Sequence, residues 1–219
     1  MALAEHGGFL HAPDIYMDKI AIGPGLPDGV VHLDASPEEN LRALAKAKKC
    51  EVGDLMVCTL GRDRHKAIIE ACRKVGARIT LLGDGDVSGV IAVSQPETGI
   101  DIYMGSGGAP EGVLAAAALR AIGGQMQGRL LFRNDDEKAR ARKWGITDLN
   151  RKYSMLDMAK GDVMFAATGV TSGSMLKGVR RFGNGAETHS IVMRSKTGTV
   201  RWISAHHNFS IKTGLPSWA

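Results

Sequence analysis

The sequence predicts an α/β protein. Between residues 55 and 124, a hydrophobic strand pattern, a polar loop and a helix signal follow one another three times, which indicates a sheet with helices packed on it. Hydrophobic residues make up 44% of the 219 positions and charged residues 23%, and there are 28 glycines, as in a globular chain with many loops. No internal repeat, low-complexity segment or linker is visible, so we expect residues 1–219 to form one domain.

Local start and stop signals define most of the elements. Ser36-Pro-Glu-Glu39 has the spacing of a capping box with proline at the first helical position, and predicts a helix that runs to about residue 48. Apolar runs and alternation predict strands at 1–4, 30–33, 55–60, 77–82, 129–132 and 162–167, helices at 66–75 and 135–144, a hairpin of 188–194 and 199–204, and an irregular tail at 211–219.

The stretch GSGGAPEGVLAAAALRAIGG, residues 105–124, follows a predicted strand at 100–104. Pro110 suits the first turn of a helix, and Gly123-Gly124 suits its end. The glycines at 105, 107 and 108 predict a turn in which the backbone comes close to a bulky group such as a phosphate or a sugar. An ordinary joint whose glycines serve packing is the alternative. The pattern is neither a dinucleotide fingerprint, because Pro110 replaces the third glycine, nor a Walker motif.

The composition of the chain limits the kinds of ligand that we expect it to bind and the cellular compartment in which we expect it to occur. A net charge of +5 suits an anionic ligand, whereas the 5% of aromatic residues and the lack of a basic run among them argue against nucleic acid. The longest apolar runs are too short for a membrane span. Three cysteines, few and odd in number, and the lack of a signal-peptide pattern in residues 1–10 favour a reducing, cytoplasmic setting.

Polar residues follow three of the predicted strands. These are Arg62 and Arg64, then Asp84 and Asp86, then residues 107–111. Because ligands of open α/β sheets bind at the carboxyl ends of the strands, the three loops predict one shared binding site.

Five motifs occur in a fixed order along the chain: APDIYMDK, GRDRH, DGD, GGAPEG and DVMFAATGVTSG. In this order they resemble the class II (GlpX-type) fructose-1,6-bisphosphatases, from about residue 3 to about residue 208. The resemblance implies a metal-dependent sugar-phosphate phosphatase with the layered lithium-sensitive phosphatase, or inositol monophosphatase-like, fold. This chain would be its carboxyl-terminal part, a mixed sheet flanked by helices.

The family also has a long N-terminal segment with most of the acidic metal ligands and the threonine and acid that act on the leaving phosphate. This sequence matches the family only after that segment, so the resemblance implies that the catalytic residues lie outside it. We therefore expect the 219-residue chain to be inactive by itself, and its partners to be a complementary N-terminal half or further copies in a homo-oligomer.

Glu111 matches the glutamate of the family that binds Mn²⁺ or Mg²⁺, and both ions prefer carboxylate oxygens. The alternative is a surface glutamate favoured by the helix dipole in the first turn. One carboxylate is not a metal site, so weak metal binding is expected.

Arg62, Asp63 and Arg64 match the basic substrate contacts of the family. A guanidinium group holds phosphate oxygens in a bidentate way, so the two arginines would clamp the phosphate that does not react. The alternative is a solvated helix start. His65 would assist them, or else serve as a cap or a surface residue.

The turn Asp84-Gly-Asp86 resembles the sugar-contacting turn of the family, with Gly85 allowing close approach of the sugar. The alternative is a plain turn. Tyr16, on or beside a loop, would lie against the sugar or donate its hydroxyl to a phosphate, unless it is only an amphipathic loop residue. Gly108 would offer its backbone N–H to the substrate.

Two further clusters are interpreted as structural. Thr168, Thr171 and Ser172 have no His–Asp partner at a suitable spacing. His206 and His207 are adjacent on a strand and therefore point to opposite faces.

The resemblance implies hydrolysis of fructose 1,6-bisphosphate to fructose 6-phosphate and phosphate, a step of gluconeogenesis. Two alternatives stay open. One is a non-catalytic module that binds or senses a sugar phosphate, and the other is a sedoheptulose-1,7-bisphosphatase.

Overall fold

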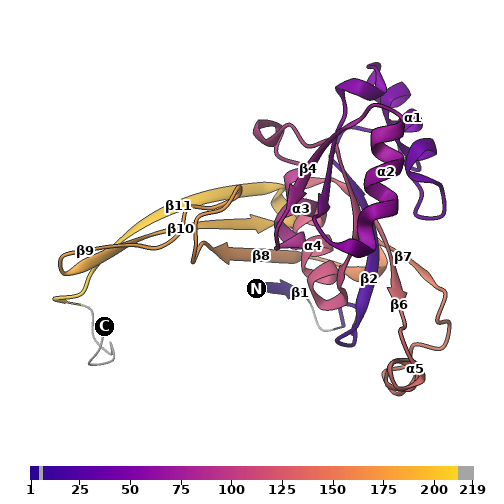
Figure 1. The fold of residues 1–219 in the computed structure, drawn as a ribbon. Coiled ribbons are helices and arrows are strands. Elements are labelled where there is room, and N and C mark those ends of the chain that lie inside the picture. The colour runs from indigo at the N-terminus through magenta and orange to yellow at the C-terminus, as the bar shows by residue number, and fades with distance from the viewer. Residues whose placement is uncertain (5–6, 212–219) are drawn as a thin grey trace.

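The computed structural model describes residues 1–4 and 7–211 and contains two β-sheets (Figure 1). The larger sheet has six strands in the order β4-β3-β5-β2-β6-β7, and it is mixed, because β3 is parallel to β4 and β5 whereas β2, β6 and β7 pair in antiparallel fashion. Its strands are β2 (Tyr16–Ile22), β3 (Met56–Leu60), β4 (Arg78–Leu82), β5 (Ile102–Gly108), β6 (Gln125–Leu131) and β7 (Lys152–Ser154).

The second sheet is antiparallel, in the order β1-β8-β10-β11, with β9 paired to β10. Its strands are β1 (Ala2–Ala4), β8 (Val163–Thr168), β9 (Arg180–Phe182), β10 (Gly185–Arg194) and β11 (Thr199–Asn208). Figure 1 shows β9, β10 and β11 as a long ribbon that extends away from the helices. The predicted hairpin and the predicted strand at 162–167 are confirmed.

Helices separate and cover the sheets. The helices α1 (Pro37–Lys48) and α2 (Lys66–Lys74) pack on one face of the larger sheet, and α3 (Asp86–Ala92) and α4 (Ala109–Ile122) pack on the other. The remaining helices are α5 (Asp135–Lys143), α6 (Met155–Met158) and the 3₁₀ turns at Val52–Asp54, Asp63–His65, Pro96–Thr98 and Ser195–Thr197. The α/β class predicted from the sequence is confirmed.

The helix α4 lies between the two sheets. Ala115 and Leu119 pack with residues of the larger sheet, whereas Ala118 and Ala121 pack with Phe165 and the second sheet. A helix buried on both sides is apolar all round, and alanine lets both sheets approach it closely. The repeated alanines of the sequence are explained by this position.

The start signal predicted for α1 and the start and stop signals predicted for α4 are confirmed. In the capping box of α1, the Ser36 hydroxyl accepts from Glu39 N at 3.2 Å, and the Glu39 carboxylate accepts from Ser36 N at 2.8 Å. Pro110 lies in the first turn of α4, and Gly123 ends that helix with a φ of 95°, a conformation that costs glycine little.

The strand predicted at residues 30–33 is wrong, since this segment is a bend that leads into a turn at Leu33. Side chains, and not a neighbouring strand, form hydrogen bonds with the backbone of this segment. Asn40, which is 3% exposed, accepts from His32 N at 2.8 Å and donates to the His32 carbonyl at 2.9 Å. The Gln127 amide oxygen accepts from Leu33 N at 2.9 Å. Because these backbone groups already have partners, the apolar run needs no sheet.

No helix among residues 1–4 and 7–211 is long and apolar enough to cross a membrane. Cys50, Cys58 and Cys72 are all free thiols, and burial raises the pKa of Cys72 to about 11. Residues 212–219 of the predicted tail lie outside the described part of the chain.

Candidate functional site

The three predicted loops meet at one edge of the larger sheet. Leu60 at the end of β3 is paired with Leu82 at the end of the parallel strand β4, and Tyr16 at the start of β2 is paired with Gly108 at the end of β5. Strand β3 is followed in the chain by β4, its neighbour on one side, and lies beside β5 on the other, so the loops after β3 and β5 flank a topological switch point. We call Tyr16 and residues 61–65, 83–86 and 107–111 the loop edge.

A buried histidine joins the loop after β3 to β5. His65 is 1% exposed, its Nδ1 lies 2.9 Å from the Leu60 carbonyl, and its Nε2 accepts from Ser106 N at 2.8 Å. These partners assign the proton to Nδ1. Burial lowers the pKa of His65 below the usual 6.5, so the ring is neutral at pH 7. The structure thus contradicts the surface position considered for His65 and gives it an interior role.

Arg64 is held by the same residue of β5 and by Tyr16. Its guanidinium donates to the Ser106 carbonyl at 2.9 Å and to the Ser106 hydroxyl at 3.1 Å. The guanidinium carbon lies 4.9 Å from the centre of the Tyr16 ring, within the range of a cation–π contact. In the described part of the chain Arg64 forms no ion pair with a carboxylate, so its charge is available to an anion.

Arg133 is a second cation at this ring, and sequence reasoning missed it. Its guanidinium carbon lies 5.1 Å from the centre of the Tyr16 ring, and the buried Glu137 pairs with it. Arg133 follows β6, whose last residue Leu131 is paired with Tyr16. The register of β2 and β6 brings Arg133 to the loop edge, and this register cannot be predicted from the sequence.

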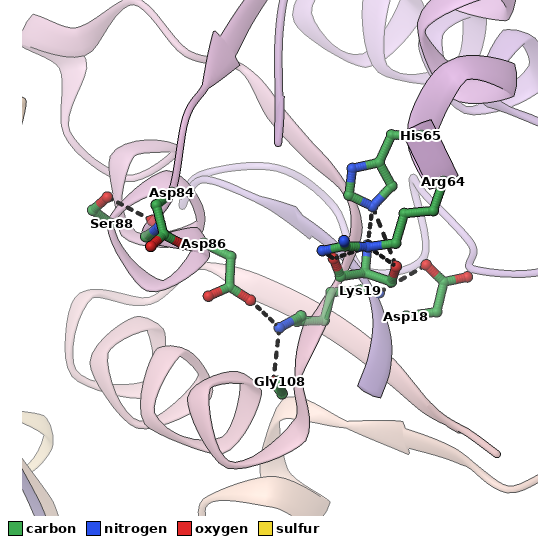
Figure 2. Close-up of polar contacts among 10 residues, drawn as sticks. Asp18, Lys19, Arg64, His65, Asp84, Asp86, Ser88 and Gly108 are labelled. Carbon is green, nitrogen blue, oxygen red and sulfur yellow. Dashed lines mark hydrogen bonds and ion pairs between the residues drawn. The ribbon is translucent and has the colours of Figure 1, made fainter. Parts of the chain in front are cut away.

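Lys19 joins the two remaining loops. Its side chain is fully buried on β2, where it forms an ion pair with Asp86 and donates to the Gly108 carbonyl at 3.0 Å (Figure 2). Burial lowers the pKa of Lys19, and the neighbouring Asp86 opposes that shift. Sequence reasoning missed Lys19 as well, although a lysine inside the apolar run YMDKIAI was a signal for it.

The glycines at 105–108 form the last residues of β5, not the predicted turn. The bulky groups near them are side chains of the protein itself. A Cβ at Gly107 would lie 2.1 Å from an Asp86 carboxylate oxygen, one at Gly108 would lie 1.8 Å from the Glu111 carboxylate, and one at Gly105 would lie 3.1 Å from the His65 ring. The close approach that we expected of a sugar or phosphate is therefore explained by internal contacts, as in the packing alternative.

Three predicted residues point away from these contacts. Arg62 is exposed, and Asp63 pairs with Lys66 in its own turn at 3.0 Å. Asp84 is exposed and accepts from Gly85 N at 2.9 Å, whereas Asp86 is buried against Lys19. Gly85 has a φ of 82°, which only glycine adopts without strain. The structure brings Arg64, Tyr16, Asp86 and Gly108 into one network of contacts, with Arg62, Asp63 and Asp84 at its rim.

The comparison with known proteins decides the family. Residues 1–207 match the family model described as bacterial fructose-1,6-bisphosphatase, glpX-encoded. The chain belongs to this family. The predicted family is thereby confirmed.

Curated relatives of this bisphosphatase family carry the name D-fructose 1,6-bisphosphatase class 2/sedoheptulose 1,7-bisphosphatase. The protein of Synechococcus sp. (strain JA-3-3Ab) is 41% identical over 94% of this chain and 63% of its own length. The protein of Trichodesmium erythraeum (strain IMS101) is 39% identical over 95% of this chain and 64% of its own length. The chain therefore spans less than two thirds of the length of these relatives.

The bisphosphatase family implies a divalent metal ion, for which Glu111 is the expected ligand in this chain. Glu111 is exposed in the first turn of α4, with its carboxylate against Gly108. Within residues 1–4 and 7–211 there is no group of three or more His, Cys, Asp or Glu side chains that could hold a metal ion. The described residues therefore do not by themselves form the site of a divalent ion.

One cavity, of about 640 Å³, lies beside β10 and is lined by residues such as Ser172, Lys177 and His189. A smaller cavity, of about 210 Å³, is lined by Asp18, Lys19 and Gly105, among others, and by Pro37 and Asn40 of α1. Burial raises the pKa of Asp18.

The two clusters interpreted as structural have internal partners. The Thr168 hydroxyl lies 2.8 Å from the Ser190 hydroxyl, and the Ser172 hydroxyl accepts from Gly178 N at 2.9 Å. On β11 the His207 ring lies 3.0 Å from the Thr188 hydroxyl.

Proposed function

We propose that this chain provides the sugar-phosphate binding part of a class II fructose-1,6-bisphosphatase, which converts fructose 1,6-bisphosphate to fructose 6-phosphate and phosphate in gluconeogenesis. The observation that supports the proposal most directly is the network at the loop edge of a chain belonging to this family: Arg64 is tied to β5 through Ser106, and Asp86 is tied to Gly108 through Lys19. The proposal includes the layered lithium-sensitive phosphatase fold, because helix and sheet layers alternate in this chain. It also includes a cytoplasmic location, because the three cysteines are free thiols.

Arg64, with Arg62 and Tyr16, is proposed to hold the phosphate that does not react. Arg64 has its guanidinium orientated by Ser106 and Tyr16 and carries a charge that no carboxylate in the described residues neutralises. Two unit charges 4 Å apart attract by about 4 kcal/mol at an effective dielectric constant near 20, before the cost of desolvation. Such binding of the remote phosphate positions the reacting end of the substrate. Asp63, exposed between the two arginines, belongs to the same loop.

The turn of Asp84, Gly85 and Asp86 is proposed to accept hydrogen bonds from the sugar hydroxyls, and Gly108 to donate its N–H to the substrate. The contact of Asp86 with Lys19 uses only Oδ2, which leaves its other oxygen for a hydroxyl donor. Asp84 is exposed beside it and is able to accept as well.

Glu111 is proposed as one ligand of a Mn²⁺ or Mg²⁺ ion. Such an ion, when bound, polarises the phosphoryl group and activates the attacking water. Glu111 is the one metal ligand that the proposal assigns to this chain, and the proposal assigns no catalytic residue to the chain.

Titration calorimetry of the purified 219-residue chain with fructose 1,6-bisphosphate tests this function, with a parallel assay of phosphate release. We expect binding without turnover, and we expect Mn²⁺ to strengthen the binding in the wild type but not in Glu111→Ala. A wild-type chain that neither binds nor hydrolyses the bisphosphate would refute the proposal.

A second function is favoured by the lack of an acidic cluster in the described residues. A non-catalytic sugar-phosphate-binding or regulatory module would bind the bisphosphate equally well with and without Mn²⁺. Because the relatives' names include both sugars, sedoheptulose 1,7-bisphosphate is to be titrated beside fructose 1,6-bisphosphate.

A further inference from the structure

We propose that Lys19 is a positioning residue that locks the turn carrying Asp86 onto the start of α4, so that both loops face a ligand in one fixed geometry. What these loops bind rests on the proposed function, whereas the locking itself is a property of the unliganded chain.

The contacts of Lys19 join segments that are distant in sequence. Asp86 is 67 residues away and is the first residue of α3, whereas Gly108 is 89 residues away and directly precedes α4. The Gly108 carbonyl belongs to the peptide that leads into the first residue of α4. The Lys19 ammonium group therefore fixes the direction of the Asp86 carboxylate and, at the same time, the direction of the peptide that follows Gly108.

The surroundings of Lys19 are built to hold it. Its strand neighbours Met17 and Ala21 pack in the cluster that contains α4, and side chains two apart on a strand share a face, so Lys19 also faces this helix. Two glycines, Gly107 and Gly112, leave space for the Lys19 side chain because they have no Cβ. A Cβ at Gly112 would lie 3.3 Å from Lys19 Cδ, and one at Gly107 would lie 3.2 Å from Lys19 Nζ. A Cβ at Gly107 would collide with the Asp86 carboxylate at 2.1 Å, and one at Gly112 would collide with Met17 Sδ at 2.6 Å, beside the lysine.

The energetics argue that this ion pair serves geometry rather than stability. Removing a lysine and a carboxylate from water has a large desolvation cost, and apolar residues of similar volume are often at least as stabilising. A buried ion pair nevertheless imposes direction, which apolar contacts do not. An aliphatic side chain at position 19 would fill the space while leaving Asp86 and the Gly108 carbonyl without their donor.

Lys48 supplies a matched control. It forms an ion pair with Asp101, which directly precedes β5 and so lies at the opposite end of the strand from Gly108. Lys48→Met thus removes a lysine–aspartate pair from the same sheet without touching the loop edge.

Hydrogen–deuterium exchange on the unliganded chain tests the locking. In Lys19→Met we expect amides of residues 83–88 and 107–111 to exchange at least tenfold faster than in the wild type, while Lys19→Arg restores part of the protection and Lys48→Met leaves both segments unchanged. Should Lys19→Met fail to fold, the double variant Lys19→Met/Asp86→Asn, which leaves no unpaired charge inside, is expected to fold and to show the same faster exchange. A folded variant with unchanged protection in both segments would overturn the proposal.

Calorimetry with fructose 1,6-bisphosphate is the second measurement. We expect Lys19→Met to bind at least tenfold more weakly and Lys19→Arg to recover part of the affinity, with Lys48→Met at the wild-type value. If the wild-type chain does not bind the bisphosphate, the proposed function fails while the exchange experiment still decides the role of Lys19. If binding occurs and is equal in Lys19→Met, the positioning role is refuted and the proposed function stands.

Discussion

Two residues at the loop edge, Arg64 and His65, are neighbours in sequence with different environments. Arg64 is exposed, and its guanidinium contacts Ser106 and Tyr16 from outside. His65 is buried and contacts the backbone of two strands. The pattern GRDRH predicted basic contacts for the loop as a whole. Which of its side chains point outward depends on where β5 lies beside β3.

Arg64→Ala is expected to weaken binding of fructose 1,6-bisphosphate by about 10- to 100-fold. Hydrogen bonds to charged groups contribute about 1.5–3 kcal/mol, and each 1.4 kcal/mol is a factor of ten in affinity. Calorimetry measures the change, and Arg73→Ala, an exposed arginine in the last turn of α2, is the control. Equal affinities of the wild type and Arg64→Ala would contradict the assigned role.

His65 predicts a pH dependence of stability. Because burial lowers its pKa in the folded chain below the unfolded value of 6.5, the unfolded state binds more protons in the window below pH 6.5. The stabilising contribution of the neutral ring is thus complete above pH 6.5 and is lost as the pH falls through the folded pKa.

Denaturant unfolding of the wild type and of His65→Gln at pH 7.5 and pH 5.5 checks this expectation. The variant should be less stable at pH 7.5 by about 1–3 kcal/mol, because a buried hydrogen-bond network is disturbed. It should also lose less stability than the wild type on going to pH 5.5. Parallel losses in the two proteins would show that His65 does not titrate as described.

At the scale of elements, local signals and tertiary contacts decided different features. The capping box at Ser36 and the C-terminal glycine of α4 act over a few residues, and both were predicted from the sequence and confirmed. The glycines at 105, 107 and 108 belong to a strand and not to the predicted turn, because β2 pairs with them along their length, and the local pattern does not encode that partner. The strand expected at 30–33 failed for the converse reason, since the Asn40 and Gln127 side chains satisfy that backbone.

Ser36→Ala is expected to lower the stability of the chain by about 1 kcal/mol, the usual cost of losing an N-cap side chain. The lost cap destabilises α1, which packs beside α2 on one face of the larger sheet. It does not change the loop edge. Thermal unfolding should therefore report a lower Tm, while affinity for the bisphosphate stays at the wild-type value. A large loss of affinity would indicate that α1 contributes to the site.

At the scale of the whole molecule, the ribbon of β9, β10 and β11 presents an edge. Among the described strands β11 pairs only with β10, and its side chains Trp202 and Ile203 are 50% and 43% exposed. A long strand with unpaired N–H and C=O groups and exposed apolar side chains favours pairing with another chain. We therefore expect the purified chain to self-associate, in agreement with the homo-oligomer anticipated from the sequence.

Ile203→Lys is expected to reduce this association, because a charge on an edge strand opposes strand pairing. Sedimentation or light scattering over a range of protein concentrations measures the effect, and Thr199→Lys, at the first residue of the same strand, is a control for added charge. An association that persists unchanged in Ile203→Lys would place the contact elsewhere.

The sequence by itself determined the fold class, the family, most element positions and the three loops of the candidate site. These features depend on periodicity, caps and turn residues within a few positions of one another, or on motifs in a linear order. Only the tertiary structure decided that the glycines of β5 accommodate Asp86 and Glu111, that His65 is internal, and that Lys19 and Arg133 reach the loop edge. Those contacts depend on strand order and register, which join residues as far apart as 89 positions in the chain, and no local pattern contains that information.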